Sequence, residues 1–240
     1  MALDDRIALP DGAELEVVIA VPEGLGPFPV VIAIHEAFGI DESMRAHVDR
    51  LAQAGYLTVM PNLFTRGGAK KCLMATFRAL LAGQGQAFDD IETTRAWAAR
   101  RTDVTDSVGV IGFCMGGGFA LMLAGRGYDA AAVNYGALPR NLDSVLSGAC
   151  PVVASYGQRD KTLAGSAAKL TQSLTRNKVP HDVVEYPNTG HAFLNPYPAG
   201  PAWMRGMLGK VMGITTNPDA APDAWNRIET FFGYHLSGKN

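Results

Sequence analysis

The stretch Ser107-Val-Gly-Val-Ile-Gly-Phe-Cys-Met-Gly-Gly-Gly118 predicts the fold more directly than any other part of the chain. An apolar strand is expected over residues 107–111, followed by the pattern Gly112-x-Cys114-x-Gly116 and a helix over residues 115–124. Glycines on both sides of the cysteine let the strand and the helix approach each other closely. This arrangement is typical of a nucleophile elbow, a strained turn that exposes a reactive side chain, with cysteine where serine is more usual.

The position of Cys114 suits a nucleophile. The first turn of the following helix offers free N–H groups to a negatively charged sulfur. The amide of Met115 would then be a natural donor to an oxyanion. The alternative interpretation is structural: a glycine-rich turn can simply hold a buried thiol, since free cysteine is among the most buried residue types.

Two further residues could form a catalytic set with Cys114. Asp160 follows the strand expected at residues 152–156, and His191 follows the strand expected at residues 182–186. Both lie just past strand ends, where open parallel sheets bind ligands. His191 could accept the thiol proton while Asp160 orients the imidazole. Taken singly, each has a plainer interpretation, the aspartate as a turn or helix cap and the histidine as ordinary structure.

Short apolar segments alternate with amphipathic segments along the rest of the chain. Because parallel strands need crossover helices, this alternation predicts an α/β fold with a mostly parallel central sheet. Strands that are apolar on both faces, such as residues 29–34, imply helices on both faces of that sheet. No linker divides the chain, so we expect one domain over residues 1–240. Further strands are expected at residues 14–21, 30–34, 56–60 and 130–135, and further helices at 41–54, 72–81, 88–100, 163–175 and 224–235, whereas residues 195–222 look the least regular.

Several short motifs, spread over nearly the whole sequence, occur together in a family order. They are His35-Glu36-x-Phe38-Gly39, Gly55-Tyr56 followed by Pro61-Asn-Leu-Phe64, Gly112-Phe-Cys114-Met-Gly-Gly117, Asp160, and Gly190-His191-x-Phe193. In this combination the sequence resembles the dienelactone hydrolase family. The resemblance implies an α/β-hydrolase fold. It also implies an enzyme that cleaves small lactones or esters through an acyl-thioester intermediate, without a metal or an organic cofactor.

The resemblance also implies roles for individual residues. The catalytic triad would be Cys114, Asp160 and His191. Glu36 would contact the resting thiol until substrate displaces it, and the backbone N–H groups of Ala37 and Met115 would form the oxyanion hole. A carboxylate beside a thiol disfavours the thiolate, which would otherwise be open to oxidation. The plainer alternative is that Glu36 caps the helix that starts near residue 41.

The sequence departs from the family pattern at one informative position. Family members that act on dienelactone hold the substrate carboxylate with arginines, one of them four residues after the catalytic histidine, where this chain has Asn195. This departure favours an alternative, a general carboxylesterase or thioesterase for uncharged substrates. Residues 195–222 could then form an altered pocket wall. The cations that could replace the missing arginine are Arg66, Lys70, Lys71, Arg78 and Arg205.

Composition excludes some functional classes. The 240-residue chain carries a net charge of −2, and its Lys and Arg residues are scattered, so no strong field would attract nucleic acid or an anionic membrane. The first residues do not resemble a signal peptide, and three cysteines are an odd number for a disulfide framework, so we expect a cytoplasmic protein. The expected partner is a small-molecule ester or lactone, and the expected assembly is a monomer or a small homo-oligomer.

The remaining motifs suggest no separate chemistry. Residues 35–39 begin like a zinc-binding helix but have Gly39 in place of the second histidine, and the glycine-rich turn lacks the Lys-Ser/Thr of a phosphate-binding loop. Cys72 and Cys150 are expected to be structural, and His47, His181 and His235 to be surface or packing residues. Two non-hydrolytic alternatives stay open, a redox-reactive thiol at Cys114 and an inactive ligand-binding scaffold. Neither alternative needs the complete set Glu36, Cys114, Asp160 and His191.

Overall fold

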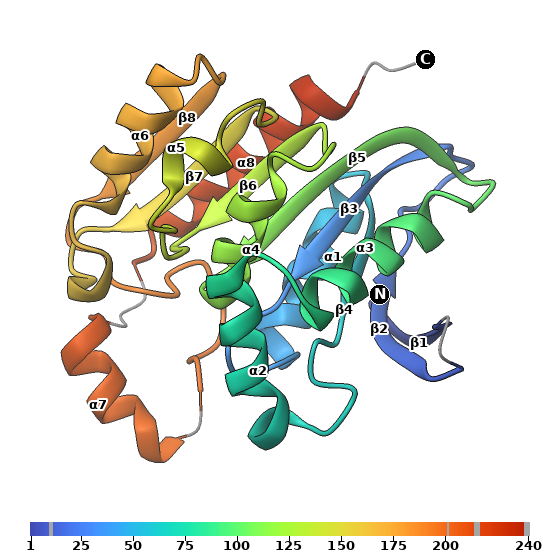
Figure 1. The fold of residues 1–240 in the computed structure, drawn as a ribbon, viewed down its shortest axis with the longest axis horizontal. Helices are drawn as coiled ribbons and strands as arrows, with labels where there is room; N and C mark the ends of the chain where they lie inside the picture. The colour runs from blue at the N-terminus through green and yellow to red at the C-terminus, as the bar shows by residue number, and fades with distance from the viewer. Residues whose placement is uncertain (10–11, 201, 214–216, 238–240) are drawn as a thin grey trace.

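The computed structural model describes residues 1–9, 12–200, 202–213 and 217–237, apart from five side chains within the helix at Ala202–Met212. The described residues form one eight-stranded sheet in the order β1-β2-β4-β3-β5-β6-β7-β8 (Figure 1). Strands β3 to β8 are parallel to their neighbours within that group, and β1 and β2 are antiparallel to theirs. The predicted mostly parallel sheet is therefore confirmed. The strands are β1 (Leu3–Ala8), β2 (Glu14–Ala20), β3 (Phe28–Ile34), β4 (Leu57–Pro61), β5 (Val104–Phe113), β6 (Ala130–Asn134), β7 (Val152–Gly157) and β8 (His181–Tyr186).

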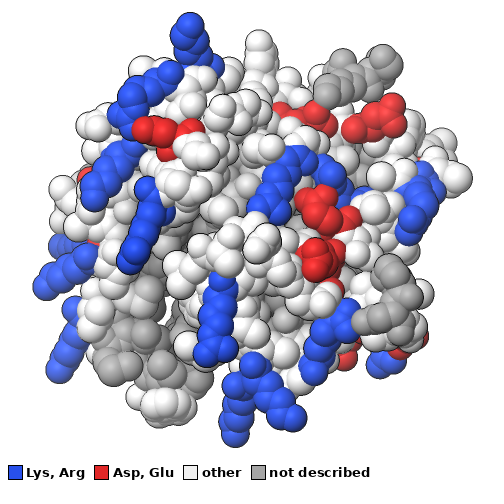
Figure 2. All heavy atoms as spheres, viewed as in Figure 1, with Lys and Arg blue, Asp and Glu red and all other residues white. Residues whose placement is uncertain are grey.

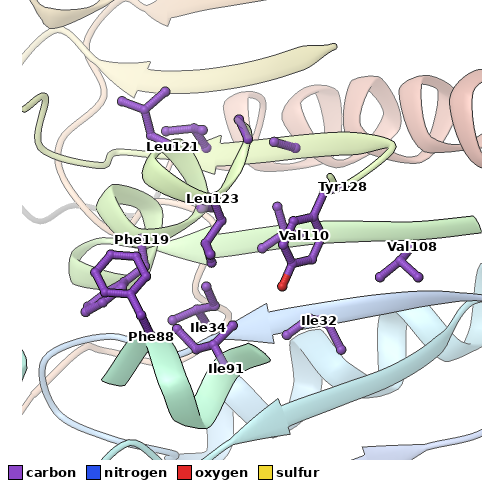
Figure 3. Packing of buried hydrophobic residues seen from close by; sticks show 14 of the residues in the cluster. Ile32, Ile34, Phe88, Ile91, Val108, Val110, Phe119, Leu121, Leu123 and Tyr128 are labelled. Atoms are coloured by element: carbon purple, nitrogen blue, oxygen red, sulfur yellow. The ribbon is translucent and has the colours of Figure 1, made fainter. Parts of the chain in front are cut away.

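Helices cover both faces of the sheet, as the doubly apolar strands predict. In β3, Ile32 and Ile34 belong to the cluster beneath α3, α4 and α6, whereas Val31 and Ala33 belong to the cluster beneath α1 and α8. This alternation follows from the period of two in a strand. Figure 3 shows Phe88 of α3 packed near Ile34 in the first cluster. The helices are α1 (Glu42–Gln53), α2 (Ala69–Ala82), α3 (Gln86–Ala98), α4 (Met115–Leu123), α5 (Leu142–Val145), α6 (Ser166–Arg176), α7 (Ala202–Met212) and α8 (Ala220–Leu236).

The structure differs from the sequence-based expectations at several places. Residues 195–222 are not uniformly irregular, because they contain α7 and the start of α8. Gly206 and Gly209 are poor helix formers, and they conceal the helical pattern of α7 in the sequence. Strand β1 was not expected, since five of its six residues are exposed and only Ile7 is buried. Helix α6 begins at residue 166 rather than 163, because Lys161–Leu163 form a separate 3₁₀ turn.

The topology brings the candidate site residues to one edge of the sheet. Glu36, Cys114, Asp160 and His191 follow the carboxyl ends of β3, β5, β7 and β8 respectively. From β3 the chain passes to β4 on one side, and β5 then lies on the other side of β3. Such a reversal of strand order creates a crevice at the carboxyl ends of the strands, where open α/β sheets bind ligands.

In the described part of the chain, surface charge and helix hydrophobicity give no further indication of function. On the face shown in Figure 2, Lys and Arg side chains are spread among neutral residues, with Asp and Glu between them. Within the part of the chain that the structure describes, no helix combines the length and the apolar character needed to cross a lipid bilayer.

Candidate active site

Cys114 occupies a strained turn between β5 and α4. Its φ is 55°, in a region that side chains other than glycine rarely adopt. A Cβ atom on Gly112 would lie 1.9 Å from the carbonyl oxygen of Gly116, and a Cβ on Gly116 would lie 2.1 Å from the carbonyl oxygen of Ile34. Only glycine fits at either position, so the close approach of strand and helix predicted for the elbow is confirmed.

Two backbone N–H groups beside the elbow are free to bind an anion. Met115 is the first residue of α4, so its N–H has no acceptor within the helix. Ala37 lies just past β3, the strand next to β5. Among the described residues, neither N–H donates a hydrogen bond to the protein. Two such donors at the ends of adjacent strands can stabilise an oxyanion.

His35 fixes the orientation of the peptide that carries the Ala37 N–H. The Leu63 N–H donates to His35 Nε2 at 3.0 Å, so the ring proton is on Nδ1, which donates to the Glu36 carbonyl oxygen at 2.6 Å. Burial lowers the pKa of His35 to about 4, so the ring is neutral. In a planar trans peptide the N–H points away from the C=O, so holding the Glu36 carbonyl also directs the Ala37 N–H.

His191 and Asp160 form a tight pair. His191 Nδ1 lies 2.5 Å from Asp160 Oδ2, while Asp160 Oδ1 accepts hydrogen bonds from the N–H and the hydroxyl of Thr162. Asp160 therefore caps the 3₁₀ turn and holds the imidazole at the same time. The two roles considered from the sequence, a cap and a partner of His191, are compatible. Burial raises the pKa of Asp160, but the hydrogen bond and the charge of His191 outweigh burial and lower it.

The other imidazole nitrogen is available to Cys114. His191 Nε2 is buried and has no well-formed hydrogen bond to any described residue. Burial disfavours the charged ring, but the interactions of His191 with Cys114 and Asp160 outweigh burial and raise the pKa of His191. The structure thus brings together the residues of the predicted triad. In this arrangement His191 can take a proton from the thiol, and Asp160 can hold the ring in place.

Glu36 lies in the same site but contacts a different partner from the expected one. Its Oε1 accepts a hydrogen bond of 2.6 Å from Asn195 Nδ2, and no hydrogen bond joins it to Cys114 among the described residues. The alternative role as a helix cap is wrong, since Asp41 caps α1 by accepting from the Met44 N–H. Burial raises the pKa of Glu36 to about 7, against the lowering effects of Asn195 and His191.

The residues that hold Asn195 are not among the site residues predicted from the sequence. His47 and Tyr135 both approach its side-chain oxygen from buried positions. His47 was expected to be a surface or packing residue, and it does pack, stacked on Phe113 with ring centroids 4.4 Å apart. One signal was present: His47 falls between Met44, Val48 and Leu51 on the buried face of α1, where an unpaired polar group would be costly.

The high pKa of Glu36 predicts a pH-dependent stability that Glu36→Gln should remove. The folded protein holds a proton on Glu36 up to about pH 7, whereas the unfolded chain loses it near 4.5, so the stabilising effect of that proton is complete below 4.5 and lost as the pH rises through 7. At 1.36 kcal/mol per pH unit this difference amounts to about 3 kcal/mol. Urea unfolding of wild type and Glu36→Gln across this range measures it.

The exposed residue Glu23 supplies a matched control for this experiment. Glu23→Gln should follow the wild-type stability curve at every pH. A constant difference in unfolding free energy between wild type and Glu36→Gln, from acid to alkaline pH, would contradict this prediction. It would mean that burial does not raise the pKa of Glu36.

Sequence comparison places this chain in a known family. The model of the dienelactone hydrolase family matches residues 15–236. The chain belongs to the dienelactone hydrolase family. A relative from Yersinia pestis, named "Putative carboxymethylenebutenolidase", is 29% identical over 93% of this chain and 85% of its own length. Family membership makes the protein a hydrolase of the dienelactone hydrolase type, a class that acts on ester and lactone bonds.

Solved structures of dienelactone hydrolases show the same fold. A crystal structure from Klebsiella pneumoniae, described as a "Putative Dienelactone Hydrolase", matches with a TM-score of 0.79 and 25% identity, covering 97% of this chain and 99% of that one. The dienelactone hydrolase from Anabaena variabilis matches with a TM-score of 0.71 and 18% identity, covering 98% and 99%. The predicted α/β-hydrolase fold is therefore confirmed.

In this dienelactone hydrolase family member, a cavity of about 800 Å³ opens beside Ala37. Its polar lining includes Asp41 and Lys70. Trp203 is 82% exposed and Tyr197 is 50% exposed, so both present aromatic surface to a molecule in the cavity. The apolar and aromatic lining residues are Ala37, Phe38, Ala69, Leu73, Tyr197, Pro198 and Trp203.

The candidate cations differ in their relation to this cavity. Lys70 lines it. Arg66 and Lys71 instead line a separate cavity of about 420 Å³, where Arg66 lies 3.6 Å from the Asp90 carboxylate. Arg78 is exposed on α2, and the side chain of Arg205 lies outside the described part of the chain. Lys70 is thus the best-placed candidate for contact with an anionic substrate group.

The other cysteines lie apart from this arrangement. Cys72 donates to the Phe64 carbonyl oxygen at 3.7 Å, and burial raises the pKa of Cys150 to about 12. In the described ranges, no three His, Cys, Asp or Glu side chains are grouped as metal ligands would be.

Proposed function

We propose that the protein hydrolyses a small lactone or ester with Cys114 as nucleophile, His191 as general base and acid, and Asp160 as the orienting carboxylate. The observation that carries this proposal is the placement of Cys114 on a strained elbow beside His191, whose Nδ1 lies 2.5 Å from Asp160. A free N–H at Ala37 and another at Met115 support it, because an acyl-transfer site needs donors for the developing oxyanion.

The proposed reaction has two halves. His191 Nε2 takes the thiol proton as sulfur attacks the carbonyl carbon, and the resulting oxyanion binds the N–H groups of Ala37 and Met115. His191 then gives the proton to the departing alkoxide oxygen, which leaves an acyl thioester on Cys114. In the second half, His191 takes a proton from water, which attacks the thioester, and then returns a proton to the sulfur as the acid leaves.

Glu36 is the proposed restraint on the thiol. Its carboxylate is buried in the same site, and a negative charge there disfavours a second negative charge on sulfur. Protonation of Glu36, or its movement when substrate enters, removes that restraint.

The arrangement of Asn195 favours a specific second candidate, a general esterase for uncharged substrates. The Asn195 oxygen already faces His47 and Tyr135, and its Nδ2 donates to Glu36, so the side chain is engaged within the protein. It therefore offers little to a substrate carboxylate. The mainly apolar lining of the cavity beside Ala37 also suits a neutral acyl or alkoxy group.

A pair of lactones that differ only by a carboxylate tests both candidates, together with a neutral aryl ester. We expect turnover of the aryl ester and of the neutral lactone, with no gain in kcat/KM from the carboxylate. A preference for the carboxylate that disappears in Lys70→Ala, but not in its neighbour Lys71→Ala, would instead support dienelactone-like specificity through Lys70. No turnover of any of the three would contradict the proposed function.

The whole chain is proposed to act as one α/β-hydrolase domain on a small-molecule substrate. One sheet contains strands from residue 3 to residue 186, which supports this organisation. A monomer or small homo-oligomer stays a prediction.

A further inference from the structure

A buried chain of hydrogen bonds connects helix α1 to the active site. His47 Nε2 lies 3.0 Å from Asn195 Oδ1, and Tyr135 donates its hydroxyl to the same oxygen at 3.4 Å. Asn195 Nδ2 donates to Glu36 Oε1 at 2.6 Å. All four side chains are buried, with Asn195 and Glu36 only 5% and 3% exposed. This burial keeps most of the chain of contacts away from bulk solvent.

The contacts fix the direction of the Asn195 amide. The Tyr135 hydroxyl donates to Oδ1, which directs the NH₂ group toward Glu36, and His47 Nε2 donates to the same oxygen in the tautomer that carries the ring proton on Nε2. Turning the amide over would set its oxygen against the Glu36 carboxylate and its N–H groups against the two donors. His47 makes the shorter of the two contacts to Oδ1 and therefore contributes more to this orientation.

His47 acts in this chain as a neutral donor. Burial lowers its pKa to about 4, so the ring is uncharged at neutral pH. Its ring stacks on Phe113 and is tilted against Trp225 at 5.1 Å, which holds Nε2 in line with Asn195. A change at His47 therefore alters a hydrogen bond and leaves the net charge near Glu36 unchanged at neutral pH.

We propose that His47 is a positioning residue for the active site: it fixes the amide of Asn195, which in turn holds the Glu36 carboxylate beside His191. The inference rests on the proposed role of Glu36 and deepens it. In this chain Glu36 is restrained by a neutral amide that is itself anchored to α1. Neither His47 nor Asn195 needs to touch the substrate.

Glu36 is the group whose titration reports on this arrangement. Burial raises its pKa, and the Asn195 hydrogen bond is the largest effect that lowers it. Loss of that bond must therefore raise the pKa further. The titratable and charged groups that surround Glu36 and His47 are His35, Asp41, Arg50, Cys114, Tyr135 and His191. All six remain in the variants below, except for the hydroxyl removed in Tyr135→Phe.

The test is a ¹³C NMR titration of the Glu36 carboxyl in glutamate-labelled protein, with the resonance identified by its loss in Glu36→Gln. We expect Asn195→Leu to raise the titration midpoint most and His47→Leu to raise it by at least about half a pH unit. Tyr135→Phe should have a smaller effect, because its contact with Asn195 is longer. His47→Gln keeps an N–H donor near the position of Nε2, so its midpoint should stay close to that of wild type.

The conservative variant separates positioning from packing. Both His47→Leu and His47→Gln lose the aromatic stacking and should lower the melting temperature, but only His47→Leu loses the donor. The inference is overturned if His47→Leu leaves the Glu36 midpoint unchanged, or if His47→Gln moves it as far. Should Asn195→Leu fail to fold, these two His47 variants still decide the question.

A second measurement keeps this inference distinct from the proposed function. The pH dependence of kcat/KM for a neutral ester should shift in the same order as the Glu36 midpoints. If wild type turns over no ester, the proposed function fails, yet the NMR order of the variants still supports or overturns the role of His47.

Discussion

Replacing Cys114 with alanine should lower kcat/KM for ester hydrolysis by at least about 10⁴-fold, because the proposed reaction passes through a covalent bond to sulfur. His191 and the two free N–H groups would remain, so only slow water attack is left. Wild type incubated with a slowly deacylating ester should gain the mass of the acyl group on the peptide that contains Cys114. Neutral hydroxylamine should release that group, as expected for a thioester.

Cys72 provides the matched control for the Cys114 experiment. Both thiols are free and partly buried, but Cys72 lies on α2 and bonds to the Phe64 carbonyl oxygen. Cys72→Ala should keep wild-type turnover and still acquire the acyl group. Retention of most activity in Cys114→Ala, or an acyl group found elsewhere, would rule out the proposed nucleophile.

Gly116→Ala should destabilise the folded protein by more than about 4 kcal/mol, which is among the largest effects of a single substitution. The new Cβ would lie 2.1 Å from the carbonyl oxygen of Ile34, and a backbone atom in the centre of the sheet cannot move aside as a flexible side chain can. Either α4 must shift away from β3 or the turn at Cys114 must open. Denaturant unfolding followed by circular dichroism measures the change.

Gly233→Ala is a matched substitution in another helix. Gly233 lies in α8, and its new Cβ would meet only the Tyr56 hydroxyl at 3.8 Å, an ordinary contact. Alanine is a better helix former than glycine, so this variant should gain up to about 1 kcal/mol. Equal stability of Gly116→Ala and wild type would mean that the elbow is far less tightly packed than the structure shows.

The elbow and the strand ends could be predicted from the sequence because their constraints are local. Glycines at 112 and 116 are needed by a turn that spans only a few residues, and each candidate catalytic residue follows the end of its own strand within five residues. Once the strands are parallel, their carboxyl ends must meet at one edge. Asp160 and His191 therefore fall on the same edge as Cys114 without any knowledge of loop structure.

The partners of Glu36 could not be predicted in this way. His47, Tyr135 and Asn195 come from a helix and two loops, and they meet only because α1 packs on the face of the sheet beneath those loops. No spacing rule connects residues 47 and 195. Sequence reasoning could identify Asn195 only as a departure from a family pattern, whereas its hydrogen bonds show where the side chain is engaged.

The wall of the cavity beside Ala37 has a practical consequence for laboratory evolution. Leu73, Tyr197 and Trp203 come from α2 and from the segment after His191, outside the sheet that carries the proposed reacting groups. Trp203 and Tyr197 are also substantially exposed, so few neighbours constrain their size. A randomised library at Tyr197 and Trp203 can therefore test new acyl and alkoxy groups while most of its members still fold.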